Sequence, residues 1–407
     1  MTELAEPATR DDTFPLARTC PFAPPPAYEK LREAGPVQRV GLPDGSEAWA
    51  ITRLEEVRQV LTDPRFSSDR FNPGFPILTK DGRPQQRRRF TASLINMDPP
   101  EHGAARREVV GEFTVKRMKA LQPRIQQIVD EHIDAILAGP KPADLVSALA
   151  LPVPSLVICE QLGVPYADHD FFQVRSSTLL NREVDQETRI KAVEELQNYL
   201  DELVAAKEAN PTDDLLGRQI LKQREEHGDV AHDELVSLAF LLLLAGHETT
   251  ANMISLGTVA LLENPDQLAI IKNDPGKTLD AVEELLRYFT IAEFATSRVA
   301  TEDVEIGGQL IREGEGVLGL SYSGNRDEAA FENADELDLE RGARHHVAFG
   351  FGPHQCLGQN LARMELQIVF DTLFRRIPEL KLAAPVDQLP FKHDSSIFGL
   401  YCLPVTW

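Results

Sequence analysis

The chain has 407 residues, of which 42% are hydrophobic and 26% are charged, and its formal net charge is -22 at pH 7. This length and apolar content suffice for a large core, and no repeat, low-complexity segment or linker divides the chain. The negative charge excludes nucleic acid and anionic membrane as partners, because both require a basic protein surface.

The four cysteines, Cys20, Cys159, Cys356 and Cys402, are scattered without a C-x-x-C pair. The sequence therefore indicates neither a zinc cluster nor a disulfide framework. The N-terminal residues lack the basic start and apolar run of a signal peptide. The longest apolar run, Leu238 to Gly246, is far shorter than the ~20 residues that span a bilayer. We expect a cytoplasmic protein.

We expect residues 1–20 to form a flexible tail and residues 21–407 to form one domain. Val37–Val40 and Trp49–Ile51 predict a β-hairpin around a Pro-Asp-Gly turn, and a helix is predicted over Leu54–Leu61. The connection from Phe66 to Asn96 lacks periodicity. A stretch of this length inside a domain is usually functional or disordered.

Helical patterns dominate the next part of the chain. Pro99 and Pro100 open a predicted helix in which His102 and Arg106 lie four residues apart on one face. Taken alone, such a pair is typical of a solvated surface. Apolar spacing predicts further helices over Leu121–Leu137, Leu145–Leu149, Ser155–Leu162, Asp168–Leu180 and Gln186–Asn210.

One long helix is predicted from Asp233 to Leu262, capped by Asp at its start. At 1.5 Å per residue it would be about 45 Å long. Its first half is apolar on every side, which implies burial. Buried polar groups are costly unless they are bonded, although a threonine can bond the carbonyl one turn earlier. The polar cluster in mid-helix consists of His247, Glu248, Thr249 and Thr250, after Gly246.

Two helices are predicted after this, over Gln267–Lys272 and Thr278–Phe289. The second contains Glu284 and Arg287, a pair that signifies little by itself. An extended run should then occupy Thr290–Arg298. We predict a hairpin of Val304–Ile306 with Gln309–Ile311, and a last hairpin over Ser395–Leu400.

A single cysteine, Cys356, lies in the glycine-rich stretch FGFGPHQCLG that leads into a helix predicted from Leu357 to Arg376. The N–H groups and dipole of a helix start favour the thiolate, which is the form that binds metal. Gly352 would supply a backbone angle that a side chain resists, and Gly358 would admit a flat ligand. The neighbouring His345 and His346 lack the spacing of a zinc site, and His346 is expected to brace the loop.

Two motifs carry a resemblance. Phe349, Gly352, Cys356 and Gly358 match F-x-x-G-x-x-x-C-x-G, and residues 245–249 match A-G-x-E-T. On these residues the chain resembles the cytochrome P-450 family of haem-thiolate monooxygenases, in its soluble actinobacterial type, over nearly its whole length. The resemblance implies a mainly α fold with small β-sheets, in which a single domain holds one haem b between the long central helix and the cysteine-loop helix.

The resemblance also implies site residues. Cys356 would bind the iron. Thr249 would hydrogen-bond dioxygen, held against the small Ala245 and Gly246, and Glu248 would relay protons. Glu284, Arg287 and Arg341 match an ion-paired brace of the haem-binding region. The haem would further contact His102, Arg106, Arg298, His354, Phe349, Gly350 and Ala245, the first four of these through its propionates.

The substrate pocket is implied in the same way. The helices over 168–180 and 186–210 would form a lid with their connection, and the 66–96 connection would cover the pocket. The residues expected to line it are Leu94, Ile95, Leu180, Leu242, Ala245, Ile291, Ala292, Phe294, Ile397 and Phe398.

The implied reaction inserts one atom of dioxygen into a C–H bond of a hydrophobic secondary metabolite, such as a terpenoid, a sterol-like molecule or a polyketide. Electrons would pass from NAD(P)H through a ferredoxin reductase and a ferredoxin, because the chain has no G-x-G-x-x-G site. The ferredoxin would dock on a basic face of the protein. Ordinary surface charge explains the basic residues of this face equally well. That face comprises Arg106, Arg107, Lys116, Arg117 and Arg363.

Two alternatives stay open. A peroxide-driven peroxygenase is one, although such relatives lack the acid–alcohol pair that Glu248 and Thr249 form here. A non-catalytic haem-binding sensor is the other, and binding alone needs neither residue. In each case we expect a monomer that binds neither nucleic acid nor membrane.

Overall fold

The computed structural model describes residues 13–79 and 93–407. The first twelve residues of the expected tail, and residues 80–92 of the connection expected to cover the pocket, lie outside this range. Within it, Phe14 is buried and its ring stacks on Tyr28 at 5.8 Å. The division into a tail and one domain stays a prediction.

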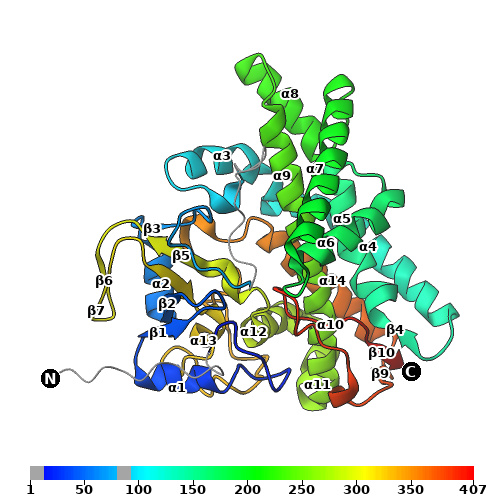
Figure 1. Cartoon of the computed structure of the whole chain (residues 1–407). Coiled ribbons are helices and arrows are strands. Elements are labelled where there is room, and N and C mark those ends of the chain that lie inside the picture. Colours follow the sequence, from blue (N-terminus) through cyan, green and yellow to red (C-terminus); the bar gives the residue numbers. More distant parts are fainter. Residues whose placement is uncertain (1–12, 80–92) are drawn as a thin grey trace.

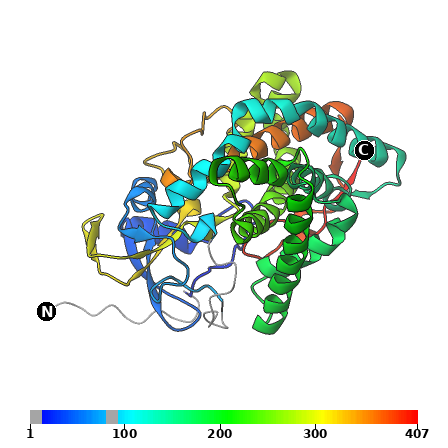
Figure 2. The ribbon, with the colours of Figure 1, turned by 90° about the horizontal axis from the view of Figure 1, so that it is seen from above.

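Helices make up most of the molecule and crowd one side of it, and most strands gather on the other (Figure 1). The short strands Ala143–Asp144, Lys381–Leu382 and Pro404–Thr406 lie on the helical side. Figure 2 shows the same two sides from above. The described residues form the helices α1 (Ala27–Ala34), α2 (Leu54–Thr62), α3 (Glu101–Val109), α4 (Val115–Ala138), α5 (Pro152–Leu162), α6 (His169–Leu180), α7 (Gln186–Ala209), α8 (Leu215–His227), α9 (His232–Gly246), α10 (Glu248–Glu263), α11 (Pro265–Asn273), α12 (Thr278–Phe289), α13 (Ser321–Gly324) and α14 (Gln359–Arg376).

The described strands form three small sheets, in the orders β1-β2-β8-β5-β3, β4-β10-β9 and β6-β7. Their bounds are β1 Val37–Gly41, β2 Glu47–Ile51, β3 Phe66–Ser67, β4 Ala143–Asp144, β5 Ser297–Ala300, β6 Val304–Ile306, β7 Gln309–Ile311, β8 Gly316–Gly319, β9 Lys381–Leu382 and β10 Pro404–Thr406. The predicted hairpins β1-β2 and β6-β7 are confirmed, and Val37 pairs with Ile51 and Val304 with Ile311.

The largest core cluster surrounds α10, which packs with α12 and α14, while α4 packs against α14. A second cluster joins α5, α7, α8 and α9. By length and composition, His232–Glu263 is the one helical stretch of the described chain that could cross a membrane, but 56% of the tested window is buried within the protein. The two clusters fix the position of α9 and α10 in the molecule.

The prediction of one helix from Asp233 to Leu262 is wrong at its middle and at its cap. Regular helical structure stops at Gly246 and resumes at Glu248, with His247 between the two helices. The N-cap is Ala231, without a side-chain bond, and Asp233 lies in the first turn. The apolar pattern runs across the break, so periodicity could not locate it.

Three other predictions need correction. Thr290–Arg298 is not extended, because Thr290 has a positive φ of 39° and a 3₁₀ turn occupies Glu293–Thr296 before β5 begins. Ser395–Leu400 is not a hairpin but part of a loop held by single bridges, Phe391 to Leu400 and Asn181 to Ser395. The cysteine-loop helix begins at Gln359 rather than Leu357.

Candidate active site

The loop before α14 presents the Cys356 side chain. Gly350 and Gly352 have positive φ values of 70° and 71°. A Cβ on Gly352 would lie 2.9 Å from the Leu61 carbonyl oxygen, so α2 packs directly on this turn. The Cys356 N–H donates to the Phe349 carbonyl at 2.8 Å. A Cβ on Gly358 would meet no protein atom within 4 Å, so the helix start borders open space.

The Cys356 thiol has exposed surface although protein surrounds it deeply. Burial raises its pKa, and the N–H groups of Gly358 and Gln359 and the charges of Arg106 and Arg363 act in the opposite direction. We expected the helix start to favour the thiolate. Its N–H groups do so, but burial outweighs them in the protein alone. A cation bound at the sulfur would reverse this balance.

Arg363 and His346 hold the underside of the loop. The Arg363 guanidinium lies 4.6 Å from the centre of the Phe349 ring and donates to the Glu283 carboxylate at 2.5 Å. His346 lies 3.1 Å from Glu283 and accepts the Ala348 N–H at 3.1 Å. Burial raises the pKa of Glu283, but bonds from His346 and Arg363 outweigh it and lower the pKa to about 2. The predicted bracing contact of His346 is present.

A cluster of basic side chains borders the cysteine loop. The rings of His102 and His354 stack at 3.9 Å. Arg106 donates to the Gln355 carbonyl at 2.6 Å, and Arg298 donates to the Ser297 carbonyl at 2.7 Å. Together these are the four residues that we expected to bind propionates.

The same cluster is electrostatically strained. Burial and the nearby charge of Arg298 lower the pKa of His354 to about 3. Burial and the charge of Arg70 lower the pKa of Arg298 to about 10. In the part of the chain that the structure describes, neither Arg70, Arg106 nor Arg298 forms an ion pair. Arg298 is buried, and an unpaired buried cation calls for an anionic ligand.

Arg70 was missed by the sequence reasoning. Its side chain has exposed surface, yet protein surrounds it and lowers its pKa. It follows β3 in an irregular segment, where neither periodicity nor a motif marks an arginine as functional. Its electrostatic effect on Arg298 places it beside the cluster.

The central helix presents small residues near its break. Ala245 is exposed although Leu243 and His247 are buried, so one side of α9 faces open space. The Thr249 hydroxyl donates to the Ala245 carbonyl at 2.9 Å. We had expected Gly246 to share this open side, but it does not. A Cβ there would lie 2.9 Å from Ile158, so this glycine serves the packing of α5.

Glu248 is buried and bonded away from Thr249. Its Oε2 accepts from Lys392 Nζ at 3.0 Å and from Asn252 Nδ2 at 3.3 Å. Lys392 belongs to the C-terminal loop, whose Gly399 packs so closely that a Cβ would lie 1.9 Å from Asn252 Oδ1. Sequence reasoning missed this lysine because nothing in the sequence brings residue 392 next to residue 248.

Two recesses lie beside this ion pair. The larger has an open volume of about 460 Å³, including solvent at its mouth, and Ile291, Phe294 and Phe398 line it with Arg18, Arg182, Glu293 and Lys392. The smaller, about 210 Å³, is lined by Leu180, Glu248, Lys392 and Tyr401 among others. Four expected pocket residues therefore line these recesses. Leu242 is buried in the second core cluster, and Leu94, Ile95, Ala292 and Ile397 are partly buried.

The expected brace is assembled below the loop. Arg287 donates to both oxygens of Glu284 at 2.7 Å, and both side chains are fully buried. Arg341 reaches the same carboxylate at 3.2 Å. Arg287 also donates to the Asn325 and Ala334 carbonyls, so the pair joins α12 to the segment before the cysteine loop.

These residues fit a haem on chemical grounds. A haem combines an iron that can bind a thiolate with two carboxylate arms. The structure offers an exposed thiol with N–H groups aimed at its sulfur, a basic cluster without carboxylate partners, and a helix that is open at the small residue Ala245. Cys356 would bind the iron, and Arg70, His102, Arg106, Arg298 and His354 would surround the carboxylates.

Comparisons with known proteins agree with this site. The family described as Cytochrome P450 matches residues 278–400. The chain is 51% identical to pentalenic acid synthase of Streptomyces avermitilis and 47% identical to vitamin D3 dihydroxylase of Streptomyces griseolus, over 100% of both chains in each case. The crystal structure of cytochrome P450 MoxA from Nonomuraea recticatena has a TM-score of 0.88 and 59% identity, covering 97% of this chain and 98% of that one.

Proposed function

The chain belongs to the cytochrome P450 family, as a haem b monooxygenase, and from this premise we propose that it hydroxylates a C–H bond of a hydrophobic secondary metabolite. The observation that supports this most strongly is the exposed Cys356 thiol beside basic groups that lack carboxylate partners. When bound, the haem supplies dioxygen activation at its iron. The protein then has to supply the thiolate that binds the iron, a path for protons and a site for the substrate.

Protons reach the reacting oxygen from the α9–α10 break. Thr249 holds its hydroxyl on the open side of the helix, where it can donate a hydrogen bond once it leaves the Ala245 carbonyl. Glu248 lies one residue away, bonded to Lys392 beside the smaller recess, and its carboxylate relays protons to the hydroxyl. A positioned acid of this kind typically contributes 10²–10⁴-fold to a rate.

Apolar side chains orient the substrate, and the small side chain of Ala245 leaves room for it beside the helix. Ile291, Phe294 and Phe398 line the larger recess beside the cations Arg18 and Arg182. Two relatives are named for pentalenic acid and vitamin D3. We propose a substrate of comparable kind, namely a terpenoid, a sterol-like molecule or a polyketide.

Electrons come from NAD(P)H through a ferredoxin and its reductase, and the protein works in the cytoplasm as a monomer. Arg107, Lys116 and Arg117 are exposed near the cysteine-loop side. Arg106 and Arg363 are turned to Gln355 and Glu283, so they contribute less to the docking face than the sequence indicated.

The proposal is tested in two steps. A library of hydrophobic metabolites is screened for ligands that shift the visible spectrum of the haem protein. Hits are then incubated with ferredoxin, reductase, NADPH and heavy-isotope dioxygen. One heavy oxygen atom in the product is the expected result. Product that forms only with added peroxide would favour a peroxygenase, and ligand binding without any product would favour a sensor.

A further inference from the structure

The break between α9 and α10 is held by side chains. The Leu243 carbonyl accepts a hydrogen bond from His247 Nδ1 at 2.7 Å, and the Ala245 carbonyl accepts one from Thr249 Oγ1 at 2.9 Å. In an unbroken helix these carbonyls accept backbone N–H groups of residues four positions later. Side-chain donors therefore serve two carbonyls of the turn before Glu248.

The bond to Leu243 also fixes the form of the His247 ring. A carbonyl oxygen only accepts, so Nδ1 carries the hydrogen and Nε2 is a bare acceptor. Nε2 is buried and has no partner in the described part of the chain. Burial lowers the pKa of His247, against the opposing charge of Glu248, so the ring stays neutral.

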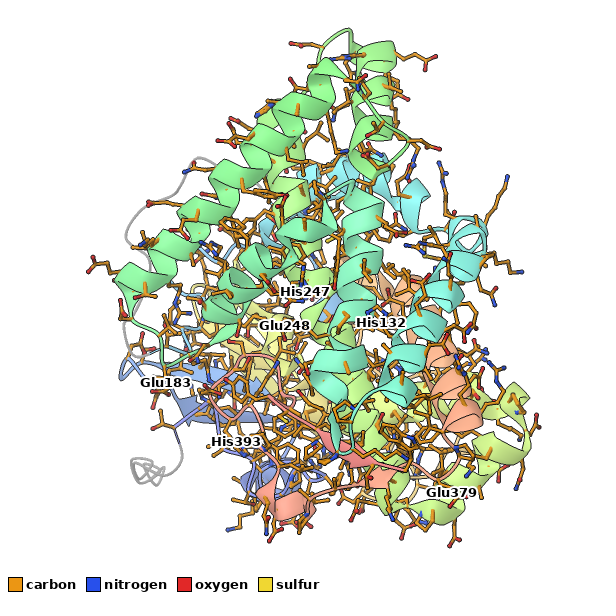
Figure 3. All side chains as sticks on the ribbon, turned by 90° about the vertical axis from the view of Figure 1, so that its right-hand side faces the viewer. His132, Glu183, His247, Glu248, Glu379 and His393 are labelled. Atoms are coloured by element: carbon orange, nitrogen blue, oxygen red, sulfur yellow. The ribbon has the colours of Figure 1, made fainter. Side chains whose placement is uncertain are left out.

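Neighbouring side chains enclose the ring. His247 is fully buried, and the Phe172 ring of α6 meets it edge-on at 5.5 Å. Next to it, Gly246 lies against Ile158 of α5. Figure 3 shows His247 and Glu248 side by side in the middle of the molecule.

The chain contains a second histidine with the same bond and a different setting. His132 Nδ1 lies 2.8 Å from the Ile128 carbonyl, but α4 continues through it without interruption. Figure 3 places His132 apart from Glu248. The bond from a histidine ring to a carbonyl therefore does not open a helix by itself. Of these two histidines, only His247 combines the bond with a helix break, and this break lies next to Glu248 and Thr249.

We infer that His247 is a positioning residue whose ring N–H occupies the Leu243 carbonyl, keeps the central helix open at this turn and so places Glu248 and Thr249. The motif A-G-x-E-T leaves this position free, so the resemblance assigns it nothing. The inference rests on the proposed function only in what Glu248 and Thr249 do. The open turn itself can be tested without any reaction.

Hydrogen exchange of the haem-loaded protein tests the inference. His247→Phe keeps a ring but removes the donor, so the Leu243 carbonyl should recover a backbone partner and the turn should close. We expect exchange of the amides of residues 247–250 to slow by roughly tenfold. His247→Asn should stay close to wild type, because Asn264 Nδ2 makes the same bond to the Ala260 carbonyl at 2.8 Å. His132→Phe is the matched control and should leave these amides unchanged.

Peroxide release per electron gives a second readout, and it should rise in His247→Phe and recover in His247→Asn, with haem content unchanged. Unaltered exchange in His247→Phe, or an equal change in His132→Phe, overturns the inference. If His247→Phe does not fold, nitrogen NMR of histidine-labelled wild type decides, since a hydrogen on Nε2 instead of Nδ1 also overturns it. Failure of hydroxylation in the wild type would count against the proposed function and leave the exchange comparison valid.

Discussion

We propose that single side chains at the helix break control the delivery of protons. Thr249 bonds the carbonyl one turn earlier, as a threonine with only a structural role would, and so does Thr258 in the same helix at 2.8 Å. The difference lies in their surroundings, because Thr258 is fully buried and Thr249 borders the open side. Only Thr249 can reach a ligand at the site.

Thr249→Ala should retain haem and substrate binding but lose the hydroxyl that guides protons. We expect product per electron to fall by roughly tenfold, with the missing electrons recovered as hydrogen peroxide. Thr258→Ala removes an equivalent bond from the same helix and should leave coupling unchanged. Equal coupling in Thr249→Ala and wild type would contradict the role given to the hydroxyl.

Lys392 is the cation that faces Glu248. Lys392→Met leaves a buried carboxylate with only the Asn252 amide, and loss of one partner of a buried pair typically costs about 3 to 5 kcal/mol. We expect urea unfolding to show that the unfolding free energy of the variant is lower by this amount. The double variant Glu248→Gln/Lys392→Met, with both charges removed, should recover most of it. A double variant no more stable than Lys392→Met would show that the pair is not the cause.

Site residues in motifs could be found in the sequence, and two residues in irregular segments could not. Cys356 and Thr249 lie in short patterns whose spacing is set by one loop or one helix turn. Arg70 and Lys392 come from irregular segments, and only the tertiary fold brings them to the site.

The helix with the strongest apolar face was predicted to the residue, and a helix of mixed composition was not predicted at all. The prediction for α12, Thr278–Phe289, is confirmed because its apolar spacing is regular and its next residue, Thr290, turns the chain. Helix α8 was not predicted, since its charged residues blur the pattern although Leu215, Leu216 and Ile220 are buried. The break at His247 depends on side-chain hydrogen bonds, which periodicity does not report.

The contact between α14 and α10 contains a buried carboxyl group. Glu365 is 1% exposed, and burial raises its pKa to about 8, against a weaker opposing bond to Thr250. Its folded pKa lies above the unfolded value, so the folded state holds a proton that the unfolded state loses. The group therefore favours folding at low pH and opposes it increasingly as pH rises toward 8.

Glu365→Gln should remove this pH dependence. Between about pH 5 and pH 8, the unfolding free energy of wild type should fall relative to the variant by roughly 1.4 kcal/mol per pH unit. Denaturant midpoints measured across this range give the difference, and the other carboxyl groups cancel in the comparison. A constant gap between the two proteins would mean that Glu365 is already ionised in the fold.

The whole molecule carries a charge of -22, and an acidic electron donor has to find a local basic surface on it. Arg107 and Lys116 are exposed and form no ion pair within residues 13–79 and 93–407. Arg117 lies 3.7 Å from Glu112. Steering by such charges mainly affects the association rate and weakens with salt.

Lys116→Glu should raise the apparent KM for ferredoxin by roughly threefold or more at low ionic strength, and the effect should shrink at high salt. Lys381→Glu, on β9, changes the net charge equally and should have little effect. Stopped-flow reduction of the haem protein by ferredoxin measures this effect in both variants. A similar loss in both variants would point to net charge rather than to a docking face.

The proposed reaction depends on the sulfur of Cys356 as the iron ligand, and one spectrum tests that directly. The reduced haem protein with carbon monoxide should show the strongly red-shifted absorption band of thiolate-bound haem. Cys356→His should lose this band, and Cys402→Ser, which alters a cysteine outside the site, should keep it. A colourless wild type prepared with ample haem, or a red-shifted band that survives in Cys356→His, would contradict the account.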